Sequence, residues 1–397
     1  MNDANQSSTP VVSRRGVLIS ICGCHLLHDG LADVIYVFLP FWRSEFDCTH
    51  AQLGVIVSLY FAALAVFQIP AGLLAERIGE RRLLVAGTVV AGAAFLIAGR
   101  VHGIISLTTL LIVSGIGSSV QHPLGASLVA QAYGSGGRRI AIGTYNFAGD
   151  LGKVLFPVIA GVALLSFAWP SVMVLLGAIA LIGSALLLVA LRWMKIGQPV
   201  SSEINGDGER QSSPSGEKNR RGFALLSCIG VIDTMTRYGL LTLLPFLLIE
   251  RGQTEARAGM ALGLLFAGGA AGKFLCGWSA QRFGAVATVW FTETLTCVGI
   301  VALLYIPNTA MIFLLPVLGA ALNGTSSVLY GAVADFVSPD RQARAFGVFY
   351  TIVIAASAAA PAMAGALSDA TTLSTATYAV AGVALLTLPL SKLLDWR

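Results

Sequence analysis

The chain has 397 residues, of which 56% are hydrophobic and only 11% are charged, and its mean hydropathy is +0.79. Soluble globular domains carry about 25% charged residues, so this composition excludes a soluble protein. We interpret the formal net charge of +5 as a signal of membrane topology and not of nucleic-acid binding.

Twelve apolar segments are long enough to cross a hydrocarbon core, which takes roughly 20 helical residues. The alternating pattern of a membrane β-barrel does not occur, so the sequence predicts an all-α membrane protein. The expected spans, in chain order, are about 16–41, 51–75, 83–99, 104–133, 140–165, 170–191, 222–249, 257–280, 285–306, 308–335, 345–368 and 372–394.

The basic residues between these spans predict the orientation of the chain. Most of the 25 Lys and Arg residues fall on the side that also carries both termini. Because cytoplasmic loops are enriched in Lys and Arg, we expect both termini to be cytoplasmic. The six cysteines are scattered, and neither their spacing nor that of the histidines predicts a metal site or a disulfide framework.

An internal duplication organises the chain. The segment Gly72–Gly79 returns as Gly277–Gly284, 205 residues later, and a parallel repeat in an apolar chain is typical of a transporter with two bundles. A polar segment separates the copies. The predicted parts are a cytoplasmic tail at 1–15, a six-helix bundle at 16–191, a cytoplasmic linker at 192–221, a second six-helix bundle at 222–394 and a cytoplasmic end at 395–397.

A short turn between the second and third spans combines glycines, which let helix ends approach, with an acid and arginines that can form ion pairs. This turn resembles the signature loop of the major facilitator superfamily, although Glu76 stands where that family usually has Asp, and Gln281 replaces the acid in the second copy. We expect the turn to latch a gate through Gly72, Glu76, Arg77, Gly79, Arg81 and Arg82.

A narrower resemblance is carried by His25–Asp29 with Pro40, by Gly117–Pro123 and by Gly149 with Gly152. These stretches resemble fosmidomycin-resistance-type efflux proteins. The resemblance implies a proton-driven carrier in the inner membrane of a bacterium that needs no cofactor besides the proton gradient. It also implies that spans one, two, four, five, seven, eight, ten and eleven line a central path.

The acids of the first span are the predicted proton carriers. His25, Asp29 and Asp33 recur every four residues and so share one helix face, with His28 beside them. Two carboxylates one turn apart repel each other, which favours a shared proton. We expect Asp29 to be the main coupling residue and Asp33 the second, with His25 or His28 sharing the proton.

Three cations inside spans, Lys153, Arg237 and Lys273, predict an anionic substrate, because Lys and Arg bind carboxylate and phosphate oxygens directly. The alternative is that Asp150 neutralises Lys153 and that Asp233 neutralises Arg237 within one helix. The predicted substrate-binding residues are Arg237, Lys153, Asp150, Asp233, His122, Gln121, Lys273, Tyr36, Asn146 and Tyr330. Glu293, on an outer span, is expected to be structural.

No nucleotide-binding loop or catalytic motif is present in the sequence, so we expect no enzyme. The predicted function is export of a small anionic or amphipathic compound in exchange for protons, by a monomer. The alternatives are import of an organic anion together with protons and, more remotely, a membrane sensor that does not transport.

Overall fold

The computed structural model describes residues 13–133, 137–194, 220–337 and 342–394. The predicted linker at 192–221 and both terminal tails lie largely or wholly outside these ranges, as does the segment 134–136 that follows the fourth span. In the described part of the chain, twelve helices or helix pairs are long and apolar enough to cross a membrane, which confirms the predicted fold class.

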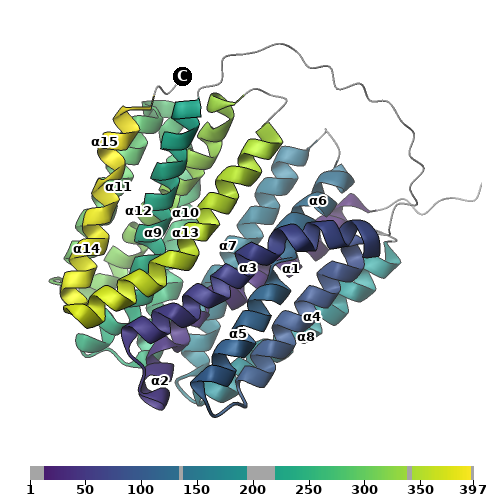
Figure 1. Ribbon diagram of the computed structural model, residues 1–397, viewed down its shortest axis with the longest axis horizontal. Coiled ribbons are helices and arrows are strands. Elements are labelled where there is room, and N and C mark those ends of the chain that lie inside the picture. Colours follow the sequence, from purple (N-terminus) through teal and green to yellow (C-terminus); the bar gives the residue numbers. More distant parts are fainter. Residues whose placement is uncertain (1–12, 134–136, 195–219, 338–341, 395–397) are drawn as a thin grey trace, which may run out of the picture.

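The first half of the chain forms one bundle, drawn in purple and blue in Figure 1. Its first and fourth spans are each divided into two helices. The helices are α1 (Arg14–Asp33), α2 (Ile35–Phe46), α3 (His50–Ile78), α4 (Glu80–Ala98), α5 (Ile104–Ser118), α6 (Gln121–Tyr133), α7 (Arg138–Ala163) and α8 (Trp169–Trp193).

The second half forms the other bundle, drawn in green and yellow beside the first (Figure 1). Its last span is also divided, and a short 3-10 helix extends α12. The helices are α9 (Arg220–Glu250), α10 (Glu255–Phe283), α11 (Ala285–Ala302), α12 (Asn308–Ala332), η1 (Val333–Phe336), α13 (Gln342–Ala370), α14 (Leu373–Leu385) and α15 (Thr387–Lys392).

The duplication is visible in the geometry of corresponding helices. The helices α3 and α10 are both 29 residues long, and each begins after a threonine cap, Thr49 or Thr254. Each ends at a glycine, Gly79 or Gly284, with a φ of 88° that side chains with a Cβ rarely adopt. The repeat therefore preserves the residues that fix where these helices start and stop.

The break between α5 and α6 has a local cause in Pro123. Proline lacks an N–H, so it suits the first turn of a helix, where that group would have no partner within the helix. The helix α5 accordingly ends at Ser118, and α6 begins at Gln121, two residues before the proline. The break places Gln121 and His122 at the start of a half-helix.

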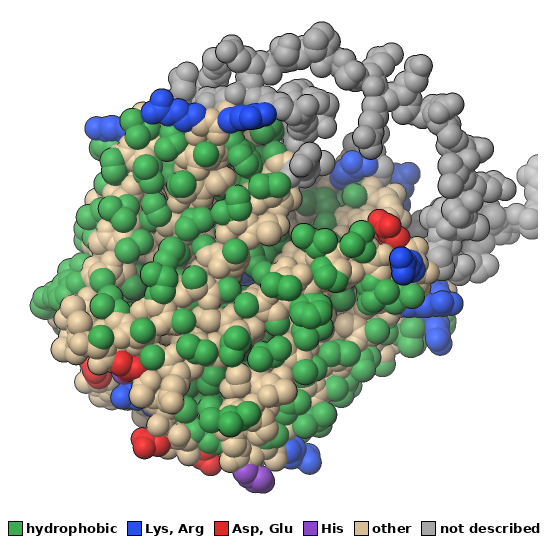
Figure 2. Space-filling model, in the orientation of Figure 1, with side chains coloured by type: hydrophobic (Ala, Val, Ile, Leu, Met, Phe, Trp, Pro, Cys, Tyr) green, Lys and Arg blue, Asp and Glu red, His purple; other side chains and the backbone are tan. Residues whose placement is uncertain are grey.

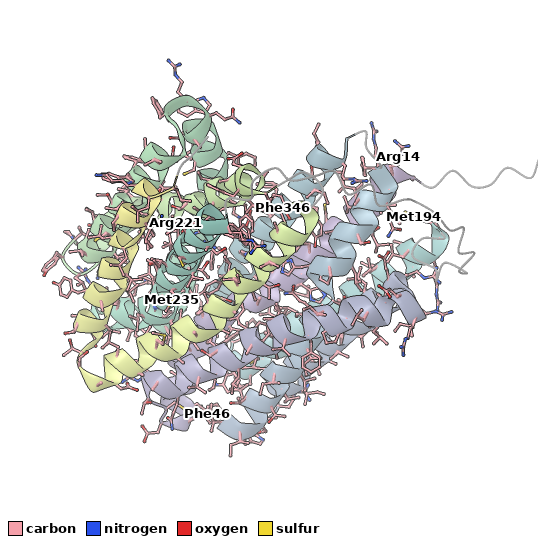
Figure 3. All side chains as sticks on the ribbon, turned by 45° about the horizontal axis from the view of Figure 1, so that its top comes forward. Arg14, Phe46, Met194, Arg221, Met235 and Phe346 are labelled. Atoms are coloured by element: carbon pink, nitrogen blue, oxygen red, sulfur yellow. The ribbon has the colours of Figure 1, made fainter. Side chains whose placement is uncertain are left out.

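The two ends of the molecule differ in how the halves meet. We call the end that carries Arg14, Met194 and Arg221 the linker end, and the end that carries Phe46 the far end (Figure 3). Basic side chains gather at the linker end, and hydrophobic side chains cover the face between the ends (Figure 2). Lipid tails are as apolar as these side chains, so the exposed hydrophobic surface fits a bilayer.

At the far end, α3 packs against α13 and α7 against α10. A Cβ added to Gly54 would lie 2.2 Å from the carbonyl oxygen of Pro361, and one added to Gly365 would lie 2.2 Å from that of His50. Glycine is required at both positions because the α3 and α13 backbones approach so closely. These contacts hold the two halves together at the far end.

Candidate functional site

A cavity of about 1430 Å³ lies between the halves. It extends from the α3–α4 turn at the linker end, where Gly72, Glu76 and Gly79 line it, to Asp33 and Phe61 in the middle of the molecule. Because the far end is packed, the cavity opens toward the linker end.

Most of the predicted site residues line this cavity, as do the polar side chains of Tyr145, Thr234 and Tyr350. The predicted residues on the lining are His25, His28, Asp29, Asp33, Gln121, His122, Asn146, Asp150, Lys153, Arg237, Lys273 and Tyr330. Two predicted substrate residues lie behind it: Tyr36 is fully buried and Asp233 is 3% exposed. The structure thus brings together the charges of both halves that the sequence left unconnected.

Lys153 of α7 lies between the two acids of α1. Its Nζ is 3.5 Å from Asp29 Oδ2 and 3.6 Å from Asp33 Oδ2. The alternative in which Asp150 neutralises Lys153 within α7 does not hold, because Lys153 pairs with the acids of α1 and Asp150 pairs with Lys273. The cation nearest to Asp29 and Asp33 thus comes from another helix, α7. The approach of α1 to α7 depends on Gly149, where a Cβ would lie 2.7 Å from both Asp29 Oδ2 and His25 Nε2.

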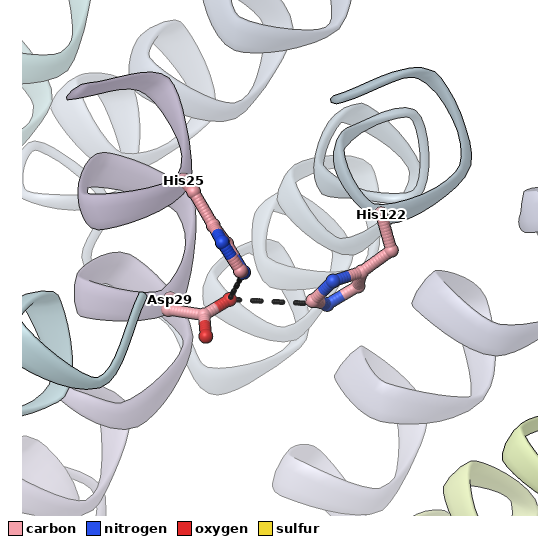
Figure 4. A group of neighbouring side chains, drawn as sticks. All are labelled: His25, Asp29 and His122. Carbon is pink, nitrogen blue, oxygen red and sulfur yellow. Dashed lines mark ion pairs between the residues drawn. The ribbon is translucent and has the colours of Figure 1, made fainter. Parts of the chain in front are cut away.

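Two histidines face the other side of Asp29 (Figure 4). Its Oδ1 is 3.3 Å from His25 Nε2 and 3.8 Å from His122 Nε2. The Nδ1 of His25 lies 2.8 Å from the carbonyl oxygen of Tyr145. A carbonyl only accepts hydrogen bonds, so Nδ1 carries a hydrogen and Nε2 is the atom that can gain or lose a proton at Asp29.

The same three side chains have the donor atoms of a metal site, since one atom of each lies within 4.8 Å of the others. The ammonium group of Lys153, however, already lies 3.5 Å from this carboxylate, and a divalent cation beside it would be repelled. The cluster of His25, Asp29, His122 and Lys153 therefore does not fit a divalent metal ion well.

His28 and Gln121 are held by bonds inside the first bundle. His28 Nε2 lies 3.0 Å from the hydroxyl of Thr88, which itself donates to the carbonyl of Leu84. His28 is therefore the donor to Thr88 in this contact. Gln121 donates its amide to the Tyr145 hydroxyl at 3.4 Å and accepts from that hydroxyl at its backbone carbonyl at 3.2 Å. These bonds orient α6 and α7 around His25.

The second half contributes an arginine with a free donor. Arg237 donates from one terminal nitrogen to Asp233 Oδ2 at 2.7 Å, which confirms the pairing within α9. Among the described residues, its Nε has no hydrogen-bond partner. Glu293 of α11 is 1% exposed, and its Oε2 has no hydrogen-bond partner among the described residues. Glu293 stands out in the sequence as an acid in the middle of an apolar span. It was expected to be structural because its span was expected to be peripheral.

One ion pair joins the two halves inside the cavity. Lys273 Nζ of α10 lies 2.6 Å and 2.7 Å from the two carboxylate oxygens of Asp150 on α7. Asp150 thus neutralises a cation of the other bundle, a pairing that sequence spacing could not predict. An anion that bound to Lys273 would have to displace the Asp150 carboxylate. Binding of such a ligand would therefore break this ion pair between the two halves.

The α3–α4 turn forms the rim of the cavity at the linker end. Glu80, the first residue of α4, accepts hydrogen bonds from Ser127 at 2.6 Å and from Gln131 at 3.0 Å. Within the ranges that the structure describes, Glu76 has no ion pair. The gate-latching role of the predicted turn residues stays a prediction, and Glu80 is a contact that the sequence analysis missed.

A second missed contact closes the far end. Asp369 of α13 accepts from the backbone N–H groups of His50 at 3.1 Å and Ala51 at 2.7 Å, at the start of α3. His50 Nδ1 also lies 3.2 Å from Asp369 Oδ1. A carboxylate is favourable at a helix N-terminus because the free N–H groups and the helix dipole point at it. Asp369 lies more than 300 positions from His50 and Ala51 in the sequence, and no sequence pattern indicated that they meet.

The arrangement of two bundles around a central polar cavity agrees with comparisons with known proteins. The family model described as "Major Facilitator Superfamily" matches residues 21–230 and 226–397. This chain belongs to the major facilitator superfamily. The superfamily is a family of transporters, and the twelve long apolar helices or helix pairs of the described residues make this chain a multi-pass membrane protein. Members of the superfamily generally need no cofactor.

Two relatives carry resistance names. The chain is 28% identical over 210 residues to the fosmidomycin resistance protein of Escherichia coli strain K12, covering 51% of each chain. It is 28% identical over 176 residues to the multidrug resistance protein MdtL of Shewanella oneidensis, covering 44% of each. The chain therefore spans about half the length of the relatives it matches. The resemblance to efflux-type transporters is confirmed.

Solved structures share the fold over nearly the whole chain. One is a bacterial homologue of the human lysosomal transporter Spinster in an inward-facing, unoccupied conformation, with a TM-score of 0.77, 18% identity, and 98% and 96% of the two chains covered. Another is the nucleoside transporter NupG, with a TM-score of 0.78, 10% identity, and 96% and 100% covered. At these identities the likeness concerns the fold alone.

Proposed function

We propose that this transporter is a proton-coupled secondary carrier that works by alternating access. It exports a small anionic or amphipathic compound, such as a phosphonate or carboxylate drug. It acts as a monomer in the inner membrane of a bacterium, with both termini in the cytoplasm. The observation that carries the proposal is the position of Asp29, which faces the cavity between two imidazoles and Lys153. The export direction rests on the resistance names of the relatives.

The proton site is centred on Asp29. A neutral His25 that donates from Nδ1 to the Tyr145 carbonyl presents the lone pair of Nε2 to a carboxylate oxygen 3.3 Å away. Two acceptors repel each other, so a proton between them is favourable. When Asp29 itself takes the proton, it no longer neutralises Lys153. Proton binding therefore changes the charge that the cavity presents to a substrate.

The anion site is centred on Arg237. Its unpartnered Nε and the hydroxyl of Thr234, also without a partner in the described structure, both belong to residues that line the cavity one turn apart on α9. Buried donors without acceptors are costly, which favours a ligand with oxygens to fill them. A phosphonate or carboxylate group supplies such oxygens and matches the planar fork of a guanidinium.

One observation favours the second candidate, import of an anion together with protons. Among the described residues, Lys153, Arg237 and Lys273 each pair with a carboxylate. An anion that binds one of these cations displaces that carboxylate, which is then stabilised by taking up a proton. Anion and proton binding would then reinforce each other, as symport requires. In an exporter that exchanges its substrate for protons, by contrast, the same site must bind the anion and the proton in different steps of the cycle.

The test is the direction of proton movement in proteoliposomes that carry a pH-sensitive dye in the lumen. With fosmidomycin loaded inside as the probe, exchange for protons acidifies the lumen as the probe leaves, whereas symport makes it alkaline. In Asp29→Asn we expect no pH change in either direction but retained exchange of labelled for unlabelled probe. The matched control is Glu45→Gln, an exposed acid at the far end.

Two results would contradict the proposal. A pH change in Asp29→Asn as large as that of the unmodified protein would remove Asp29 from the proton path. Proton flux driven only by lipophilic cations, and never by phosphonates or carboxylates, would remove the anionic substrate.

A further inference from the structure

The inner end of the cavity carries two aromatic rings that neither the proton site nor the anion site uses. Phe61 of α3 and Tyr238 of α9 both line the cavity, and their ring centroids lie 5.0 Å apart in an edge-to-face arrangement. Tyr36 of α2 is fully buried behind them, with its ring centroid 6.5 Å from that of Phe61 and 6.4 Å from that of Tyr238. The two lining rings are therefore supported from behind by a third.

The wall of α3 next to Phe61 is apolar. Phe61, Leu64 and Ala65 stand at positions i, i+3 and i+4, so they share one face of the helix, and all three line the cavity. This face runs from the ring contact toward the α3–α4 turn at the linker end, and it becomes polar at Gln68, which lines the cavity one turn further along. Water against apolar surface is unfavourable, so an apolar group that covers this face gains free energy.

The wall of α9 next to Tyr238 is polar. Thr234, Arg237 and Tyr238 likewise stand at positions i, i+3 and i+4 and line the cavity. The Thr234 hydroxyl and the Arg237 Nε have no hydrogen-bond partner among the described residues. Because α9 starts at the linker end (Figure 3), this face also runs from the ring contact toward that end. An apolar wall and a wall with unfilled donors thus meet at one pair of rings.

The cavity has room for a ring and an acid group in one ligand. Its volume is about 1430 Å³, whereas sites for small molecules commonly take roughly 300–1,000 Å³. The acid that lines the same depth, Asp33, has its Oδ2 3.6 Å from Lys153 Nζ. This cation offsets the repulsion that the Asp33 carboxylate would exert on a bound anion.

We propose that Phe61 and Tyr238 form a subsite for an aromatic ring, and that the substrate is an aromatic carboxylate or phosphonate. The ring of the substrate packs against these two side chains and Leu64. Its acid group accepts hydrogen bonds from Thr234 and from the Arg237 Nε. Since Phe61 and Tyr238 belong to opposite halves, the bound ring contacts both halves at once. The contacts of the acid group rest on the proposed function, whereas the ring subsite does not.

Calorimetry on the purified full-length protein tests the proposal with three probes that divide such a ligand into its parts. Phenylphosphonate has the ring and the acid group, methylphosphonate has the acid group, and benzyl alcohol has the ring. We expect phenylphosphonate to bind roughly 10- to 100-fold more tightly than methylphosphonate, because its ring buries apolar surface. In Phe61→Ala this preference should fall roughly tenfold, with the affinity for methylphosphonate unchanged. The control is Phe147→Ala, which removes a ring of α7 that is 43% exposed and does not line the cavity.

The variant Phe61→Leu keeps an apolar side chain and so protects the fold if Phe61→Ala is unstable, and the preference for phenylphosphonate should fall in it too. Equal affinities of the two phosphonates for the unmodified protein, or a preference that both Phe61 variants leave unchanged, would overturn the ring subsite. If benzyl alcohol binds, Phe61→Ala weakens it and neither phosphonate binds, the ring subsite stands and the anion site of the proposed function fails. If none of the three probes binds, both sites fail.

Discussion

Removing the carboxylate of Asp369 should shift the protein away from the conformation described here. This side chain accepts from two backbone N–H groups of α3 across the far end. The contact can exist only while the far end is closed, because it joins α13 of one bundle to α3 of the other. When the far end opens, both partners are free to bind water, so Asp369→Ala weakens one conformation and leaves the other nearly unchanged.

The size of the shift follows from known capping energies. Replacing an acidic helix cap by Ala costs about 0.5–2 kcal/mol, and a charge at a helix N-terminus contributes about 0.3–1 kcal/mol. The side chain is 30% exposed, so solvent screens part of the charge and we take about 1–2 kcal/mol in total. Since 1.4 kcal/mol corresponds to a factor of ten, the ratio of the two conformations should change roughly 5- to 30-fold.

Spin labels across the linker-end mouth measure this ratio. Cysteines at Gln131 and Thr351, in a background where the six native cysteines are replaced, carry the labels on residues of opposite bundles that line the cavity. In Asp369→Ala the population with a short distance should grow. The control is Glu45→Ala, which removes an exposed acid at the same end. A distance distribution that Asp369→Ala leaves unchanged would refute the role of this contact.

Further substitutions test the predicted anion site at Arg237 and two contacts between the halves. Arg237→Gln should weaken fosmidomycin binding roughly 10- to 150-fold, the equivalent of a hydrogen bond to a charged group at about 1.5–3 kcal/mol, with a much smaller effect on thermal stability; equal affinity in calorimetry would contradict this. Asp150→Lys and Lys273→Asp should each abolish transport, and the double exchange should restore most of it, whereas a double variant as inactive as the single ones would argue against the ion pair. Gly54→Leu should prevent closure of the far end, because the new Cβ would meet the Pro361 carbonyl oxygen at 2.2 Å; normal transport rates in this variant would show that the two helices do not need to approach so closely.

The sequence by itself determined the scaffold. Apolar length and turn glycines are local properties, so they predicted twelve spans, and the repeat of Gly72–Gly79 predicted two related bundles. Individual ionisable residues at membrane depth also marked the cavity, because a charge in an apolar span is too costly to occur without a use.

Only the tertiary structure decided which charges meet. Sequence spacing identifies neighbours on one helix, and it succeeded for Asp233 with Arg237, which lie one turn apart on α9. It failed for Lys153, whose partners come from α1, and it could not reach the contact of Asp369 with the start of α3. Coulomb energy depends on distance in space and not along the chain, so the pairing that defines the site followed from how the bundles pack.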